Sequence, residues 1–160
     1  MKKLTLTIIA LFIFVMASVG FSADVTLTYT DGSSWQSTSV LVGEEASEIE
    51  LEWTTNSSGN AECTMQLGTA LPRGIYYLQG KCIETKPGSP APTSSYTLTI
   101  KDSYSVDILD GQGASRSTSS GEAIYIDYTP ISPELTLSVT GASSGSGNKG
   151  YIKMIIHRAR

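Results

Sequence analysis

Three glutamates in one segment are the first residues whose type and spacing could support chemistry. Glu48, Glu50 and Glu52 alternate with apolar residues, so a strand would place all three carboxylates on one face. Clustered carboxylates can bind a cation. The same spacing is typical of the solvated face of an edge strand, and we favour that interpretation. Glycoside hydrolysis needs two carboxylates across a cleft, and no such pair stands out. A small exported hydrolase therefore stays open only as an alternative.

Three aspartates around one turn form a second acidic group. Asp102, Asp107 and Asp110 lie close together in the sequence and are candidate calcium ligands. Their spacing does not match the EF-hand loop, which also needs a glycine at a fixed turn position. Aspartate is equally a common turn residue. We leave calcium binding open here and assign no metal ligand.

Nucleophilic catalysis finds no support in the sequence. His157 is the single histidine and lies beside Arg158 near the end of the chain, and no serine stands in a G-x-S-x-G elbow. Gly111 and Gly113 are not followed by a third glycine or by a helix, so a phosphate-binding loop is not indicated. Two cysteines and one histidine are too few ligands for a structural zinc site. We predict no catalytic residues, no cofactor and no metal.

Aromatic side chains offer a different kind of site. Two tryptophans and eight tyrosines could form a platform on which sugar rings stack, which makes a carbohydrate-binding module an alternative function. Trp53 follows the same alternation as Ile49 and Leu51, so we predict that it lies in the core. Trp35 follows Gly32-Ser33-Ser34 and is the better candidate for an exposed aromatic residue that contacts a ligand, with a place in the sandwich core as the alternative.

Charge argues against nucleic acid as a partner. The formal net charge is −4, and charged residues make up only 16% of the chain. Nucleic-acid binding needs clustered Lys and Arg that displace counterions from phosphates. The nearest approach to a cluster is Lys153, His157, Arg158 and Arg160 at the C-terminus, which we interpret as a solvated end strand.

The first 23 residues have the pattern of a secretory signal peptide. Lys2 and Lys3 precede an apolar stretch over residues 4–19, and small residues follow up to Ala23. We predict cleavage near Ala23 and export to the periplasm, cell surface or medium. An uncleaved membrane anchor is the alternative, although the apolar stretch is short for a span of about 20 residues. No second stretch of this kind follows.

Export bears on the two cysteines, because thiols outside the cytosol are commonly oxidised. A hairpin that turns at 71–74 would place Cys63 directly opposite Cys82 and Leu67 opposite Leu78. Proline and glycine suit that turn, and directly opposed residues can be bridged. Such a disulfide would stabilise the fold by about 3 kcal/mol in the chain-entropy model. We favour the disulfide, with two buried thiols as the alternative.

The segments between these residues alternate with the period of β-strands. The predicted strands cover residues 24–30, 35–42, 48–55, 61–67, 75–85, 96–101, 106–109, 122–128, 134–140 and 151–157. Turn residues separate them, and no amphipathic helix is indicated. The proline-rich segment 86–95 cannot be a central strand, and we predict that it crosses between two sheets. This pattern favours one all-β domain over residues 24–160, an antiparallel β-sandwich that is immunoglobulin-like in the loose sense.

Three segments of the second half resemble a recurring group of small, largely uncharacterised proteins of bacteriophages and prophages. The segments are PGSPAPTSSYTLTIKD at 87–102, VDILDGQGASRSTSS at 106–120 and PELTLSVTGA at 133–142. The positions that match the group's pattern are Tyr96, Thr99, Asp102, Val106, Asp107, Ile108, Leu109, Gly111, Gly113, Ala114, Arg116, Pro133, Leu135, Thr136, Leu137 and Val139. The resemblance covers about residues 87–157 and implies a β-rich structural or accessory protein.

Together these observations favour an exported, non-enzymatic structural or binding protein of phage ancestry. The partner is a protein or a surface glycan of unknown identity, and self-assembly is open. The carbohydrate-binding module stays as the alternative, because its aromatic platform would need only exposed rings. Sandwich function lies in surface and loop geometry that composition does not fix.

Overall fold

The computed structural model describes residues 25–67, 74–143, 145 and 147–159. Within these residues the chain forms nine strands and no helix. The strands are β1 (Thr26–Thr28), β2 (Ser34–Val42), β3 (Ala46–Thr54), β4 (Ala61–Gln66), β5 (Tyr76–Pro87), β6 (Thr97–Lys101), β7 (Glu122–Ile131), β8 (Glu134–Thr140) and β9 (Lys149–Arg158). The predicted signal peptide lies outside the described residues. In the described part, no helix is long and apolar enough to cross a membrane.

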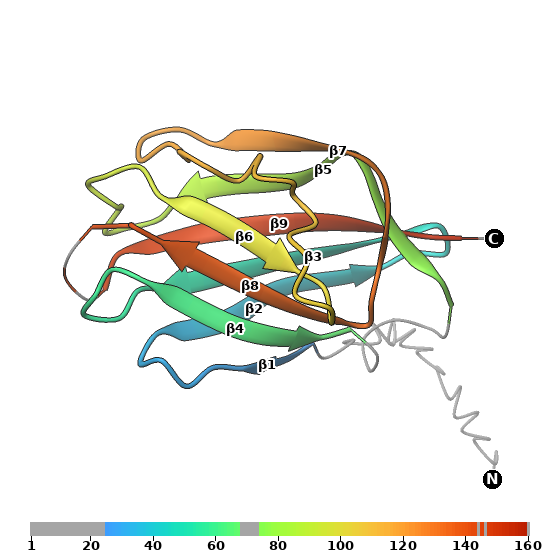
Figure 1. Ribbon diagram of the computed structural model, residues 1–160, viewed down its shortest axis with the longest axis horizontal. Coiled ribbons are helices and arrows are strands. Elements are labelled where there is room, and N and C mark those ends of the chain that lie inside the picture. The colour runs from blue at the N-terminus through green and yellow to red at the C-terminus, as the bar shows by residue number, and fades with distance from the viewer. Residues whose placement is uncertain (1–24, 68–73, 144, 146, 160) are drawn as a thin grey trace, which may run out of the picture.

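The strands form two antiparallel sheets that pack face to face (Figure 1). The smaller sheet has the strand order β1-β4-β8-β6, and the larger has the order β2-β3-β9-β5-β7. This arrangement confirms the predicted all-β sandwich. The chain passes from β5 in the larger sheet to β6 in the smaller one through the rest of the proline-rich segment. Its first two residues, Lys86 and Pro87, differ from the prediction, because they belong to the central strand β5 and pair with β9.

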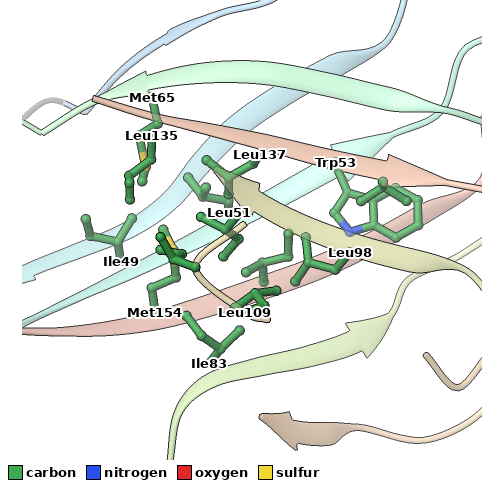
Figure 2. Close-up of a cluster of buried hydrophobic side chains, with 14 of the residues drawn as sticks. Ile49, Leu51, Trp53, Met65, Ile83, Leu98, Leu109, Leu135, Leu137 and Met154 are labelled. Carbon is green, nitrogen blue, oxygen red and sulfur yellow. The ribbon is translucent and has the colours of Figure 1, made fainter. Parts of the chain in front are cut away.

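The core lies between the sheets and follows the alternation of the strands. Ile49, Leu51 and Trp53 of β3 are fully buried, as predicted. Leu98 and Leu137 of the smaller sheet are buried with them, in one cluster between the two sheets (Figure 2). Each strand turns one face inward because successive side chains point to opposite faces. The opposite face of each sheet is turned toward solvent.

The pairing of β4 and β5 differs from the predicted hairpin. β4 pairs with β1 and β8, whereas β5 pairs with β7 and β9, so the two strands lie in different sheets. The predicted hairpin is therefore wrong. Residues 68–73, which include most of its predicted turn, lie outside the described residues. The physical reason is burial: both strands have apolar faces, and each face is covered by the opposite sheet.

A loop covers the free edge of β6 where the sequence predicts a short strand. The amide of Leu98 donates to the carbonyl oxygen of Gly113 at 2.9 Å, and the amide of Ile108 donates to Ile100 at 2.8 Å. A Cβ atom at Gly113 would lie 1.8 Å from the Leu98 oxygen, so only glycine allows this approach. Residues 106–109 form turns instead of a strand, and Val106 is 58% exposed rather than buried.

Candidate functional site

Trp35, the residue predicted to be an exposed ligand contact, is buried in the core. It is only 4% exposed, and on β2 it pairs directly with Trp53 of β3. The prediction is wrong because the register of β2 against β3 shifts between Ser37 and Ser39. Across this irregularity Trp35 and Val40 both turn toward the core, whereas strict alternation would place them on opposite faces. Trp35 cannot contact a ligand from this position.

Both cysteines are buried free thiols in the structure. Cys63 lies on β4 and Cys82 on β5, in opposite sheets. Each side chain is about 1% exposed, and burial raises the pKa of each thiol above its ordinary value. The hairpin geometry that favoured a disulfide does not occur, so the alternative of two buried thiols agrees with the structure.

The aspartates that were candidate calcium ligands hold turns together. Asp102 Oδ1 accepts hydrogen bonds from the amides of Tyr104 and Val106, at 2.9 and 3.0 Å. Asp107 accepts from the amides of Leu109 and Gly111, each at 3.1 Å. Among the described residues, no group of three or more His, Cys, Asp and Glu side chains could hold a metal ion. Asp102 and Asp107 thus act as turn residues.

The three glutamates of β3 lie on the solvated face, but β3 is not an edge strand. It pairs with β2 on one side and β9 on the other, so the edge-strand interpretation is wrong. Two of the carboxylates are paired with lysines of β9. Lys153 Nζ lies 2.9 Å from Glu48, and Lys149 Nζ lies 2.9 Å from Glu52. The carboxylate of Glu50, between them, forms no hydrogen bond or ion pair within the described part of the chain.

A groove of about 350 Å³ opens on this outer face of the larger sheet. Its floor is a row of directly paired residues on four neighbouring strands: Glu50, Lys153, Glu84 and Ala123. The full lining consists of Glu50, Lys81, Glu84, Thr85, Lys86, Gly121, Glu122, Ala123, Tyr151 and Lys153. Since most of these residues lie on paired strands, the groove is held rigidly. Its size falls within the range of small-molecule sites.

The groove lining holds equal numbers of glutamates and lysines, and some of them form no ion pair. Lys81 Nζ lies 2.8 Å from Glu84, and the hydrogen bond that it donates holds the pKa of Glu84 below its ordinary value. Lys86 is exposed and, like Glu50, forms no hydrogen bond or ion pair among the described residues. The groove therefore presents one free acceptor, Glu50, and one free donor, Lys86, on opposite sides of β9.

Tyr151 supplies the aromatic ring of the groove. Its hydroxyl donates a hydrogen bond to Glu52, which raises the pKa of Tyr151. Lys149 and Tyr151 both donate to Glu52 and lower the pKa of that carboxyl. This network fixes the ring beside Lys86, its partner in the β5–β9 register. A ring held in place on a strand loses little entropy when a ligand packs on it.

A second aromatic group on the same sheet is a stack of three rings. Tyr77 of β5 packs against Tyr128 of β7, with ring centroids 4.6 Å apart, and against His157 of β9, with centroids 5.4 Å apart. Because β7 and β9 flank β5, the neighbours cover Tyr77 from either side. His157 therefore belongs to a surface stack of rings, in which Tyr128 is 55% exposed.

The groove does not follow from the sequence because its residues come from segments far apart in the chain. Glu50 stood out only as part of the glutamate cluster, and Lys153 only as part of the basic residues near the C-terminus. The signal that could have indicated the site was the alternation of β5 and β9, whose outward residues include Lys81, Lys153 and Tyr151. That signal places them on one sheet face only after the pairing of β5 with β9 is known.

No protein-family model and no curated protein matches the chain. Among solved structures, the chain is similar to TmCBM61 in complex with beta-1,4-galactotriose, with 15% sequence identity and a TM-score of 0.33. That match covers 88% of this chain and 92% of the other. A likeness at this TM-score carries no argument about function. The resemblance to phage proteins is untested and stays a prediction, as does export.

Proposed function

We propose that this protein is a non-enzymatic binding domain that holds a neutral saccharide in the groove of its larger sheet. The observation that carries this proposal is the row Glu50, Lys153 and Glu84 on the groove floor, with Tyr151 beside it. It deepens the carbohydrate-binding alternative of the sequence analysis but moves the site away from Trp35. The predicted signal peptide would bring the domain to a compartment where surface glycans are accessible.

The alternating charges suit a ligand that is rich in hydroxyl groups. A hydroxyl group donates one hydrogen bond and accepts others, whereas carboxylates only accept and lysine ammonium groups only donate. Glu50 and Lys86 therefore bind hydroxyl groups in the two complementary ways. The groove lining holds three glutamates and three lysines, which favours a neutral ligand over a strongly charged one. Hydrogen bonds to charged groups are also the stronger ones.

Tyr151 adds the apolar part of saccharide recognition. Pyranose rings have a face of C–H groups that packs on an aromatic ring, and a tyrosine buries apolar area while keeping its hydroxyl hydrogen-bonded. The hydrogen bond to Glu52 keeps the Tyr151 ring in one orientation. The ring and the free groups of the groove thus combine stacking with directional hydrogen bonds, the two interactions that a sugar ring needs.

Binding without catalysis agrees with the state of Glu84. Glycoside hydrolysis needs one carboxyl group with a raised pKa that donates a proton to the leaving group. Lys81 instead lowers the pKa of Glu84, so this carboxyl group is ionised and acts only as an acceptor. We assign Glu84 to ligand binding and to the ordering of Lys81.

Glycan binding by the full-length protein tests the proposal. A glycan array identifies the ligand, and isothermal titration calorimetry with that glycan then compares Glu50→Gln with the wild type. We expect Glu50→Gln to weaken binding about tenfold, because it removes a charged acceptor and keeps the side-chain shape. Glu62→Gln is the matched control, since Glu62 is an exposed carboxylate on β4 of the other sheet.

The expected control result is an unchanged dissociation constant for Glu62→Gln. An array without any bound glycan contradicts the proposed function. Equal effects of Glu50→Gln and Glu62→Gln would place the binding site elsewhere and overturn the assignment of the groove.

A further inference from the structure

The groove floor belongs to a row that crosses the whole larger sheet. In the strand registers Ser39 pairs with Glu50, Glu50 with Lys153, Lys153 with Glu84, and Glu84 with Ala123. These five residues lie on β2, β3, β9, β5 and β7, so the row runs perpendicular to the strands. Four spacings between neighbouring strands give the row a length of about 19 Å.

Both ends of this row have small side chains. Ser39 lies on β2 and Ala123 on β7, and these are the two edge strands of the sheet. The three central residues, Glu50, Lys153 and Glu84, are long and charged. A pocket for a single sugar or for a chain end needs a wall, but serine and alanine are too short to build one at either edge.

Glu122 does not close the end at β7. Its carboxylate accepts a hydrogen bond from the amide of Ser117 at 2.6 Å, and Arg116 lies 3.8 Å away. These two contacts hold the Glu122 side chain toward the loop that precedes β7. The small residue Ala123 therefore decides how the row ends at this edge.

We infer that the groove binds internal segments of a linear polysaccharide, which runs across the strands and leaves over both edges of the sheet. This inference rests on the proposed function, because it describes the ligand of the same groove. The charged centre of the row supplies hydrogen bonds to successive sugar units, and the small ends let the chain continue. An internal segment of the polymer and a long oligosaccharide should then bind with the same affinity. A monosaccharide contacts only part of the row.

A series of oligosaccharides tests this inference with the full-length protein. The probes are the monosaccharide, oligosaccharides of increasing length and the soluble polymer of the neutral glycan that gives the strongest signal on the array. We expect the affinity to rise with chain length until the oligosaccharide spans the row. Longer oligosaccharides should then bind with the same affinity as one binding site on the polymer. Blocking the reducing end of a long oligosaccharide should leave its affinity unchanged.

Variants at the two ends of the row give the sharper test. We expect Ala123→Trp and Ser39→Trp each to weaken polymer binding about tenfold or more, while an unchanged far-UV circular dichroism spectrum shows that the variants fold. Asp127→Trp is the matched control, because Asp127 is exposed on β7 and lies outside both the row and the groove lining. It should bind the polymer like the wild type.

The outcomes separate the two proposals. If the monosaccharide binds as tightly as the polymer, or if Ala123→Trp and Asp127→Trp act alike, the internal-chain inference is wrong while saccharide binding stands. If end-blocking abolishes binding, the groove recognises a chain end and the inference is also wrong. If no saccharide binds at all, both the proposed function and the inference are overturned.

Discussion

At the residue scale, burial decides what each candidate side chain can do. Trp35 and Trp53 are both in the core, so neither tryptophan is available for a ligand. The two thiols are likewise enclosed by apolar neighbours. The side chains of Glu50 and Lys86, by contrast, line a groove and form no hydrogen bond or ion pair among the described residues.

The thiols give a prediction at this scale. We expect neither Cys63 nor Cys82 to react with a thiol reagent in the folded protein at mildly alkaline pH, because both are buried and burial raises their pKa values. Unfolding in denaturant without a reductant should release both thiols for titration. Thiols that appear only after reduction would show a disulfide and contradict the free thiols of the structure.

At the element scale, each strand of the core has one buried and one exposed face. β3 shows this alternation along its whole length, with Ile49, Leu51 and Trp53 inward and Glu50 outward. β2 carries Leu41 on the outer face, where it is 62% exposed. Two leucines on neighbouring strands thus occupy opposite environments, although the sequence around each is rich in β-formers.

This pair of leucines gives a prediction about stability. Leu51→Ala should lower the free energy of unfolding by about 2–5 kcal/mol, because it removes a fully buried side chain and leaves a cavity. Leu41→Ala should lower it by less than about 1 kcal/mol, since the side chain is already solvated. Denaturant unfolding followed by tryptophan fluorescence measures both. Equal losses would contradict the assignment of strand faces.

At the scale of the whole molecule, several lysine–glutamate ion pairs lie on the outer face of the larger sheet. Lys149 with Glu52 and Lys81 with Glu84 lower the pKa values of the two carboxyl groups. The same contacts raise the pKa values of the lysines, mainly through the hydrogen bonds to their partners. These pairs couple the stability of the sheet to pH on both sides of neutrality.

The sign of each shift fixes the pH prediction. A carboxyl group with a lowered pKa stabilises the fold above its ordinary value of 4.5 and loses this contribution as the pH falls through its folded-state pKa. The raised lysine pKa values stabilise the fold below 10.5 and lose this contribution as the pH rises further. The melting temperature should therefore be level near neutrality and fall at both extremes.

A variant with Glu52→Gln and Glu84→Gln tests this origin of the pH dependence. Its melting temperature should fall less than that of the wild type when the pH drops below about 4.5, because the variant lacks two carboxyl groups whose protonation is coupled to unfolding. Differential scanning calorimetry over a pH series measures the difference. Parallel curves for the variant and the wild type would mean that other carboxyl groups dominate.

The sequence by itself determined the local structure. The alternation over residues 134–140 predicted β8 with the bounds that the structure shows, and the inward position of Ile49, Leu51 and Trp53 followed from the same period. The class of fold followed as well, because many short strands with turns between them can bury their apolar faces only as stacked sheets. Turn residues and side-chain period act over a few residues, so a single segment contains the information.

Only the tertiary structure decided which strands are neighbours. β3 pairs with β9 about a hundred residues later in the chain, and this contact places Lys153 beside Glu50. The hairpin predicted between β4 and β5 failed for the same reason, since pairing depends on which apolar faces cover each other and not on the intervening turn. The register shift between Ser37 and Ser39 of β2 places Trp35 in the core together with Val40, which strict alternation along the strand does not predict. The groove exists because β3, β9, β5 and β7 lie side by side, which no single segment of the sequence specifies.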